Sequence, residues 1–255
     1  MRSLLRKIIN YALGFAELEI IRRHTPDSLL KSAHLATLID GGANDGGFAC
    51  RARAIAPEAM IHSFEPVPWI YQKLAATFKS DKRFHAYQLA LSDANDDRRF
   101  EINEDEYSSS LLPMRSTAKE VLATIAPTEK HIQVDITTLD AWAVGKELVR
   151  PILLKLDLEG NELAALRGAD KLLDQIDFVF IEISFILLRD GQPTFREIFD
   201  LLWDRGFELI DVYPGLMDKR TGQTIWADCL FGRKSSRSER DSTEIAPARD
   251  IACRT

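Results

Sequence analysis

The chain has 255 residues, of which 45% are hydrophobic and 28% are charged, and its formal net charge is −6 at pH 7. This length and composition suit one large globular domain with a full core, and the acidic balance gives no reason to expect a nucleic-acid partner. The cysteines Cys50, Cys229 and Cys253 show neither CxxC nor metal-ligand spacing. A reducing, cytoplasmic location is therefore expected.

Residues 1–34 are predicted to form a helical segment ahead of the main domain. Basic residues precede an apolar run, as in a signal peptide, but Asn10 divides the run and no small-residue cleavage site follows Glu17. The apolar residues fall at helical spacing on one face: Leu4, Leu5, Ile8, Ile9, Ala12 and Leu13. We expect an amphipathic helix that packs on the domain or on a second subunit of a homo-oligomer, with contact to a membrane surface as the alternative. No stretch is long enough for a transmembrane segment.

The next segment combines a glycine-rich turn with an acid at a fixed distance. A predicted strand over 35–40 ends in the pattern Asp-x-Gly-x-x-x-Gly, from Asp40 through Gly42 to Gly46, and a predicted helix over 48–56 follows. A second predicted strand over 60–64 leads into Glu65 and Pro66, nineteen residues after Gly46. Parallel α/β sheets bind nucleoside-like cofactors with this arrangement, because glycines let backbone approach the ligand and the carboxylate accepts hydrogen bonds from a ribose.

The details of the turn narrow the ligand. A dinucleotide fingerprint has glycines at its first, third and sixth positions, but the third position here is Asn44 or Ala43, depending on whether the count starts at Gly42 or Gly41. The turn resembles instead the first motif of S-adenosylmethionine-dependent methyltransferases. The ammonium and the carboxylate of that cofactor suit Asp40 and free backbone N–H groups, respectively. The structural alternative is a strand–turn–helix whose glycines serve packing alone.

The remaining elements alternate between helix and strand, with one interruption. A helix is predicted over 69–78 and a strand over 84–91, which leads into Ser92. Residues 93–135 break the rhythm and are interpreted as an insertion over the cofactor site; its serine run at 108–110 either closes on a ligand or forms a solvated loop. A strand over 151–156 then ends at Asp157. It is followed by a helix over 162–173 that is interrupted near Gly168, a strand over 178–183 and a helix over 194–203 with Thr194 as its N-cap. Strands over 207–212 and 225–231 and a disordered tail over 233–255 complete the chain.

This alternation predicts an α/β, doubly wound, mainly parallel seven-stranded sheet of the Rossmann-like methyltransferase type, in a domain over residues 35–232. Ligands in such sheets bind beyond the carboxyl ends of the strands. Asp40, Glu65, Ser92 and Asp157 all follow or end predicted strands. We therefore expect them to line one crevice.

Five motifs occur in the order found in the FkbM family of methyltransferases, which the chain resembles from about residue 35 to residue 231. They are Asp40-x-Gly-Ala-Asn-x-Gly with Phe64-Glu65-Pro66, Ala90-Leu91-Ser92-Asp93, Thr138-Leu139-Asp140, Lys155-Leu156-Asp157-Leu158-Glu159-Gly160-Asn161-Glu162 and Ile181-Glu182-Ile183. The resemblance implies methyl transfer from S-adenosylmethionine to an oxygen, commonly a hydroxyl of a sugar, glycan or natural product. It implies that Gly42, Ala43, Asn44, Gly46, Glu65, Pro66, Ser92 and Asp40 bind the cofactor.

Lys155, Asp157 and Glu159 are the candidate catalytic residues. Their period-two spacing sends them to one side if the strand continues through Glu159. Asp157 is expected to accept the hydroxyl proton or to orient the acceptor, and Glu159 to do the same or to hold a divalent metal together with Asp157. For Lys155 the alternative is a structural ion pair with Asp157 or Glu182.

Two other functions compete with methyl transfer. A non-catalytic S-adenosylmethionine-binding or regulatory subunit would lose the substrate-side acids, yet Asp157 and Glu159 are present. An NAD(P)-dependent oxidoreductase would need the middle glycine and a Tyr-x-x-x-Lys pair, and neither Tyr87 nor Tyr107 has a lysine four residues on. The expected partner of the methyltransferase is a small-molecule or glycan acceptor.

Overall fold

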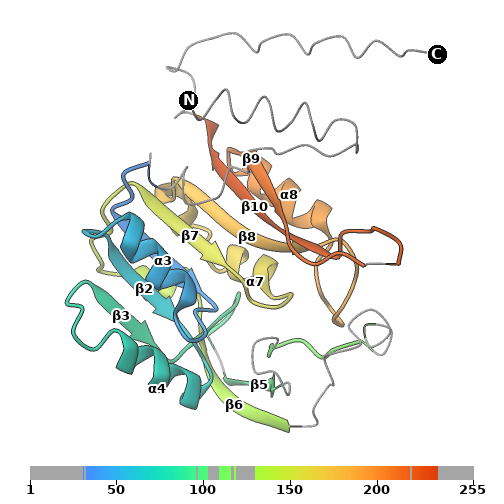
Figure 1. The fold of residues 1–255 in the computed structure, drawn as a ribbon, viewed down its shortest axis with the longest axis horizontal. Helices are drawn as coiled ribbons and strands as arrows, with labels where there is room; N and C mark the ends of the chain where they lie inside the picture. The colour runs from blue at the N-terminus through green and yellow to red at the C-terminus, as the bar shows by residue number, and fades with distance from the viewer. Residues whose placement is uncertain are drawn as a thin grey trace, which may run out of the picture.

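The computed structural model describes residues 31, 33–95, 97–102, 109–115, 118, 130–218 and 220–234. The predicted amphipathic helix, residues 235–255 of the predicted disordered tail, and the parts of the insertion around Tyr107 and Ser108 lie outside the described residues. The predicted start of the tail at residue 233 is wrong, because Arg233 is the last residue of a strand. A seven-stranded sheet with the strand order β3-β2-β1-β7-β8-β10-β9 runs through the molecule (Figure 1). Its strands are β1 Thr37–Gly41, β2 Met60–Phe64, β3 Phe84–Tyr87, β7 Ile152–Leu156, β8 Phe178–Ser184, β9 Phe207–Pro214 and β10 Trp226–Arg233.

The strand directions confirm the predicted doubly wound, mainly parallel sheet. The five strands from β3 to β8 are parallel to their neighbours, and β10 runs antiparallel to both β8 and β9. In chain order, β2 and β3 lie on one side of β1, and β7 and β8 lie on the other side of β1. The order therefore reverses between β1 and β7, and such a switch point opens a crevice at the carboxyl ends of the strands.

Helices cover both faces of the sheet because successive strand residues point to opposite faces. On one face, α3 (Gly47–Ile55) and α4 (Pro68–Thr77) pack on Leu38, Leu153 and Phe180. On the other face, Ile39 and Leu154 pack against α6 (Leu139–Ala143), α7 (Glu162–Arg167), the 3-10 helix η1 (Leu172–Gln175) and α8 (Phe195–Asp204). Burial on both faces means that every residue of β1 and β7 is buried, including Asp40 and Lys155.

The prediction of one strand over 84–91 is wrong. β3 ends at Tyr87, and residues 90–91 form β4 (Ala90–Leu91), which pairs with β6 (Lys130–Thr137) in a second sheet of order β4-β6-β5 that includes β5 (Asp97–Ile102). The break has a packing cause, because Ala90 joins a separate apolar cluster with Phe100 and Val134. This second sheet lies beside the carboxyl edge of the main sheet, below β7 in the view of Figure 1.

Two local predictions on the later helices are confirmed. The helix over 162–173 is interrupted at Gly168, where an added Cβ would lie 2.1 Å from the carbonyl oxygen of Ser92. Thr194 caps α8 in a capping box with Glu197. Among the helices of the described segments, none has the length and apolar character needed to cross a membrane.

Candidate active site

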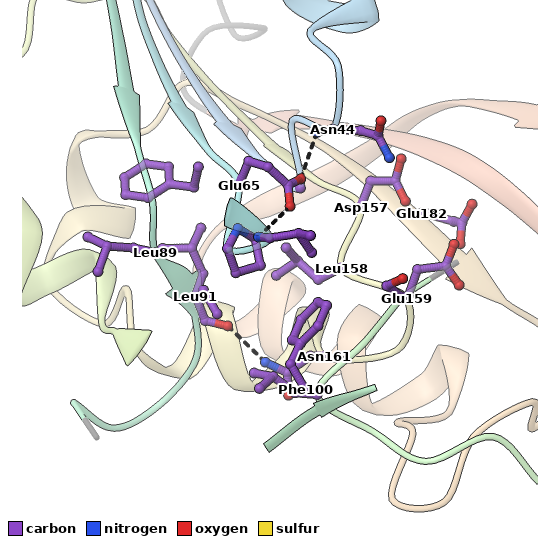
Figure 2. A pocket seen from close by; sticks show the side chains of 17 residues that line it. Asn44, Glu65, Leu89, Leu91, Phe100, Asp157, Leu158, Glu159, Asn161 and Glu182 are labelled. Carbon is purple, nitrogen blue, oxygen red and sulfur yellow. Dashed lines mark hydrogen bonds between the residues drawn. The ribbon is translucent and has the colours of Figure 1, made fainter. Parts of the chain in front are cut away.

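A cavity opens at the switch point between β1 and β7, and it has an apolar end and an acidic end. In Figure 2 the side chains of Leu89 and Leu91 lie on one side, and the carboxylates of Asp157, Glu159 and Glu182 lie on the other. The lining residues come from the turn after β1, the end of β2 and the segment after it, the segment after β3, the segment after β7, β8 near its end, and the insertion. They are Gly42, Asn44, Phe64, Glu65, Pro66, Val67, Leu89, Ala90, Leu91, Phe100, Ser109, Leu111, Asp157, Leu158, Glu159, Asn161 and Glu182.

Glu65 is held rigidly between two backbone amides (Figure 2). Asn44 N donates to Oε2 at 3.0 Å, and Val67 N donates to Oε1 at 2.8 Å. The residue is 5% exposed, and this burial raises the pKa of Glu65 to about 7 despite the two amides. Each carboxylate oxygen accepts one amide and retains a lone pair. The group can therefore accept two further hydrogen bonds from a ligand in the cavity.

The glycines of the turn serve different purposes. Gly42 has a φ of +72°, and an added Cβ would lie 1.9 Å from the carbonyl oxygen of Asp157, so the turn packs directly on the loop after β7. Gly46 has a φ of +92°, and its Cβ would lie 2.7 Å from Phe78 and 2.8 Å from Leu74. The glycine at position 46 is therefore required where α3 approaches α4. Ala43 is buried in the same apolar cluster.

Asp40 and Lys155 form a buried pair of opposite charges beneath the turn. Asp40 is fully buried and accepts a hydrogen bond from Ser63 Oγ at 3.2 Å. Lys155 Nζ lies 3.2 Å from Asp40 Oδ1 and 3.6 Å from Asp157 Oδ2, and it donates to the carbonyl oxygens of Gly41 at 3.1 Å and Gly42 at 2.7 Å. Although burial opposes it, the charges of Asp40 and Asp157 raise the pKa of Lys155 above its ordinary value.

The predicted site residues therefore separate into two groups. Gly42, Asn44, Glu65, Pro66, Asp157 and Glu159 line the cavity. The other five are buried and are not among the lining residues: Asp40, Ala43, Gly46, Ser92 and Lys155.

The acidic end is assembled by a turn and not by a continuing strand, so the expected geometry was wrong. β7 ends at Leu156, and Glu159 and Gly160 adopt positive φ values of 54° and 100°. The turn nevertheless brings Asp157 and Glu159 to Glu182 of β8, and carboxylate oxygens of the three residues all lie within 4.8 Å of one another. Figure 2 shows this group facing one side of the cavity.

Burial destabilises the charged forms of three carboxylates at or near this end, those of Glu159, Glu182 and Asp228. Burial raises the pKa of Glu159 to about 7, although Arg189 opposes the shift. Burial and the charge of Asp157 also raise the pKa of Glu182 well above its ordinary value, and they raise that of Asp228 on β10 to about 6. Such a cluster favours a cationic ligand, or a proton shared among its members.

Three residues that support the site were not predicted. Asn161 lines the cavity, and its Nδ2 donates to Leu91 O at 2.8 Å. Glu162 Oε1 accepts from Leu158 N at 2.8 Å and Gly160 N at 3.1 Å, which holds the turn. Arg189 forms an ion pair with Glu159 at 3.2 Å. The first two are part of the Asp157–Glu162 motif, but no sequence pattern connects Arg189 to Glu159, thirty residues earlier.

The chain is similar in sequence to known methyltransferases. Residues 40–209 match the family described as the methyltransferase FkbM domain. The chain is 27% identical over 184 residues to the 2-O-methyltransferase NoeI of Sinorhizobium fredii, covering 69% of this chain and 74% of that protein. It is 28% identical over 149 residues to the hexuronic acid methyltransferase AglP of Haloferax volcanii, covering 57% of this chain and 55% of that protein.

A similar solved structure is that of the methyltransferase FkbM from Methylobacillus flagellatus. It shares 14% identity with a TM-score of 0.46, and the match covers 78% of this chain and 44% of that one. The family match spans more than half of the chain and includes the turn after β1, Glu65 and the acidic turn after β7. This protein therefore belongs to the FkbM methyltransferase family and is a methyltransferase.

Proposed function

We propose that the enzyme transfers a methyl group from S-adenosylmethionine to a hydroxyl oxygen of a sugar, glycan or natural product. The observation that carries the proposal is a single cavity with Glu65 on one wall and the cluster of Asp157, Glu159 and Glu182 at its acidic end. The names of two relatives, a 2-O-methyltransferase and a hexuronic acid methyltransferase, support a carbohydrate acceptor.

The lining residues fit the cofactor. S-adenosylmethionine supplies a methyl group that is already activated by its sulfonium. Glu65 would accept hydrogen bonds from the ribose hydroxyls, since its oxygens are oriented by Asn44 N and Val67 N. The apolar end would cover the adenine through Leu89, Leu91, Phe100 and Leu158. Asp40, Ala43, Gly46 and Ser92 would then support the cofactor site from behind its wall.

The residues at the acidic end would orient the acceptor hydroxyl and accept its proton. The hydroxyl must lose its proton as its oxygen gains the methyl group, and Asp157, whose side chain is 44% exposed, is positioned to accept that proton. Glu159 and Glu182 would orient the acceptor beside it. The alternative role for these residues is to hold a divalent cation such as Mg²⁺, which prefers carboxylate oxygens. Activity that is lost in EDTA and restored by Mg²⁺ would establish the metal role.

Calorimetry and a transfer assay test the proposal. The protein should bind S-adenosylmethionine and S-adenosylhomocysteine but not NAD; the reverse preference would support the oxidoreductase alternative. Labelled methyl transfer to methyl glycosides of hexoses, N-acetylhexosamines and hexuronic acids then tests the acceptor class. An alkali-stable product is a methyl ether from a hydroxyl, whereas an alkali-labile product is an ester from a carboxylate. If the protein binds S-adenosylmethionine but transfers its methyl group to no hydroxyl compound, whether glycoside or natural product, the result would favour a non-catalytic subunit.

A cytoplasmic location and a homo-oligomeric state remain predictions. Cell fractionation of the full chain tests the first, and light scattering in solution tests the second. Recovery of the full chain with membranes, together with a soluble variant that lacks residues 1–23, would contradict the predicted packing of the N-terminal helix on protein.

A further inference from the structure

Part of the insertion is joined to the loop after β8 by backbone hydrogen bonds. Met114 and Arg189 form an antiparallel bridge. On either side of the bridge, Arg115 N donates to Leu188 O at 2.9 Å and Asp190 N donates to Pro113 O at 2.9 Å. Residues 109–115, which we call the insertion wall, therefore pair with a segment that starts only a few residues beyond Glu182.

Arg189 connects the insertion wall to the acidic turn through its side chain. The residue is 2% exposed. Its Nη1 donates to Leu112 O at 3.1 Å, and its Nη2 lies 3.2 Å from Glu159 Oε2. The backbone amide of Arg189 donates to Gln192 Oε1 at 3.0 Å, which fixes the turn that carries the arginine. One guanidinium thus binds a wall carbonyl and a site carboxylate at the same time.

Ser110 makes a second connection between the same two segments. It is fully buried, and its Oγ donates to Glu159 O at 2.9 Å while accepting from Leu112 N at 3.0 Å. A Cβ on Gly160 would lie 3.4 Å from Arg189 and 3.4 Å from Leu112, so the three segments are in close contact. Glu159 is therefore held by its main chain and by its side chain.

The residues on either side of Ser110 face the cavity. Ser109 and Leu111 both line it, together with Glu159. The Arg189 side chain is 3% exposed and that of Glu159 is 27% exposed, so changing Glu159 would leave the buried arginine charge without its partner. The planar fork of an arginine can satisfy two acceptors in fixed directions, which the single ammonium of a lysine cannot reproduce.

We propose that Arg189 is a positioning residue, which fastens Glu159 to the insertion wall and so holds Glu159 and Ser109 at the acceptor side of the cavity. The proposal rests on the proposed function, because it assigns a substrate-selecting role within the same site. Arg189 acts through Glu159 and the wall.

The test compares Arg189→Lys with Arg115→Gln. The control removes an exposed ion pair between the same two segments, in which Arg115 Nε lies 3.5 Å from Asp190 Oδ1 and the side chains are 39% and 65% exposed. Hydrogen exchange of peptides covering residues 109–115 should be about tenfold faster in Arg189→Lys, because the wall opens more often. In Arg115→Gln it should stay within about twofold, since exposed pairs contribute little.

Kinetics provide the readout that separates positioning from a general structural role. With the glycoside that the acceptor panel identifies, Arg189→Lys should raise the acceptor KM about tenfold and change the S-adenosylmethionine KM by less than about threefold. Parallel increases in both KM values, or exchange rates that match those of Arg115→Gln, would overturn the proposal.

Two further measurements keep the test decisive. If Arg189→Lys does not fold, Ser110→Ala replaces it, because this variant removes the second connection to Glu159, and an unchanged acceptor KM in it refutes the positioning role of the insertion wall. If the wild-type protein fails to bind S-adenosylmethionine, the proposed function is wrong, and the exchange comparison still decides whether Arg189 holds the wall.

Discussion

Asp40 and Lys155 lie opposite each other on the neighbouring parallel strands β1 and β7, with 3.2 Å between Asp40 Oδ1 and Lys155 Nζ. The pair is shielded from solvent, since the side chains are 0% and 7% exposed. Because Lys155 also donates to the carbonyl oxygens of Gly41 and Gly42, this contact determines the shape of the turn at the switch point. The lysine thus supports the cofactor side of the site. An ion pair of Lys155 with Asp157 or Glu182 was the predicted alternative; the structure has the pair with Asp157 at 3.6 Å and a closer one with Asp40, which was not predicted.

Replacing Lys155 should destabilise the fold strongly. Lys155→Met leaves Asp40 buried without its counter-charge, which costs about 3–5 kcal/mol of unfolding free energy. Urea denaturation of the variant measures this loss. In the double variant with Asp40→Asn, a large part of the stability should return, because the uncompensated charge is gone. A single variant with wild-type stability would rule out a structural role for the pair.

The turn should not tolerate a side chain at Gly42. Gly42→Ala introduces a Cβ 1.9 Å from Asp157 O at a φ of +72° and should therefore disrupt the contact between the turn and the acidic loop. Gly145→Ala is the matched control, because Gly145 has the same φ with no atom within 4 Å. The control should lose about 1–2 kcal/mol from backbone strain alone. Gly42→Ala should lose about 1–3 kcal/mol more and bind S-adenosylhomocysteine more weakly; equal losses would refute the close approach.

Glu65 should contribute to cofactor affinity. Glu65→Ala removes charge-assisted hydrogen bonds worth about 2–3 kcal/mol, so S-adenosylmethionine should bind about 30- to 100-fold more weakly in calorimetry. Burial raises the pKa of Glu65 to about 7, so wild-type affinity should increase as the carboxylate ionises with rising pH through that value. Glu58→Ala is the control, because its carboxylate is 80% exposed and pairs with Arg83 at the surface. Unchanged affinity in a folded Glu65→Ala variant would remove this residue from the site.

Asp157 should affect chemistry more than cofactor binding. Asp157→Asn should slow methyl transfer about a hundredfold or more, the scale of losing a general base, while S-adenosylmethionine affinity changes by only about a few-fold. Asp190→Asn, whose carboxylate is 65% exposed and outside the cavity lining, should keep near-normal turnover. If Asp157→Asn and Glu159→Gln both retain wild-type rates on a confirmed acceptor, alignment of the substrates alone carries the reaction.

Glu162 should make stability depend on pH. Burial raises its pKa from 4.5 to about 7, so the folded state binds the proton more tightly than the unfolded state. Its stabilising contribution is present below pH 4.5 and is lost as the pH rises through about 7. Glu162→Gln keeps an oxygen for the amides of Leu158 and Gly160 but cannot titrate. Its unfolding free energy should therefore fall less steeply between about pH 5 and 8 than that of the wild type; identical slopes would contradict this assignment.

Local patterns were sufficient for most of the fold. Strand β2 was predicted at its observed bounds, and α8 was predicted with its Thr194 cap, because hydrophobic periodicity and capping depend on neighbours within a few residues. The site prediction included Glu65 and Asp157, which line the cavity because they directly follow strands of a parallel sheet and so reach its carboxyl edge; the roles assigned to them stay predictions. It did not separate the residues that line the cavity from those, such as Lys155, that lie behind it.

The sequence by itself determined the order of the strands and helices, the glycine turn and the family, since these follow from residue type and spacing along the chain. Only the tertiary structure decided that residues 84–91 divide between two sheets and that Lys155 faces Asp40. It also decided that Glu182 and Arg189 reach Glu159. These contacts join segments far apart in sequence, and their partners are chosen by packing and by the need to compensate buried charge, which no local pattern encodes.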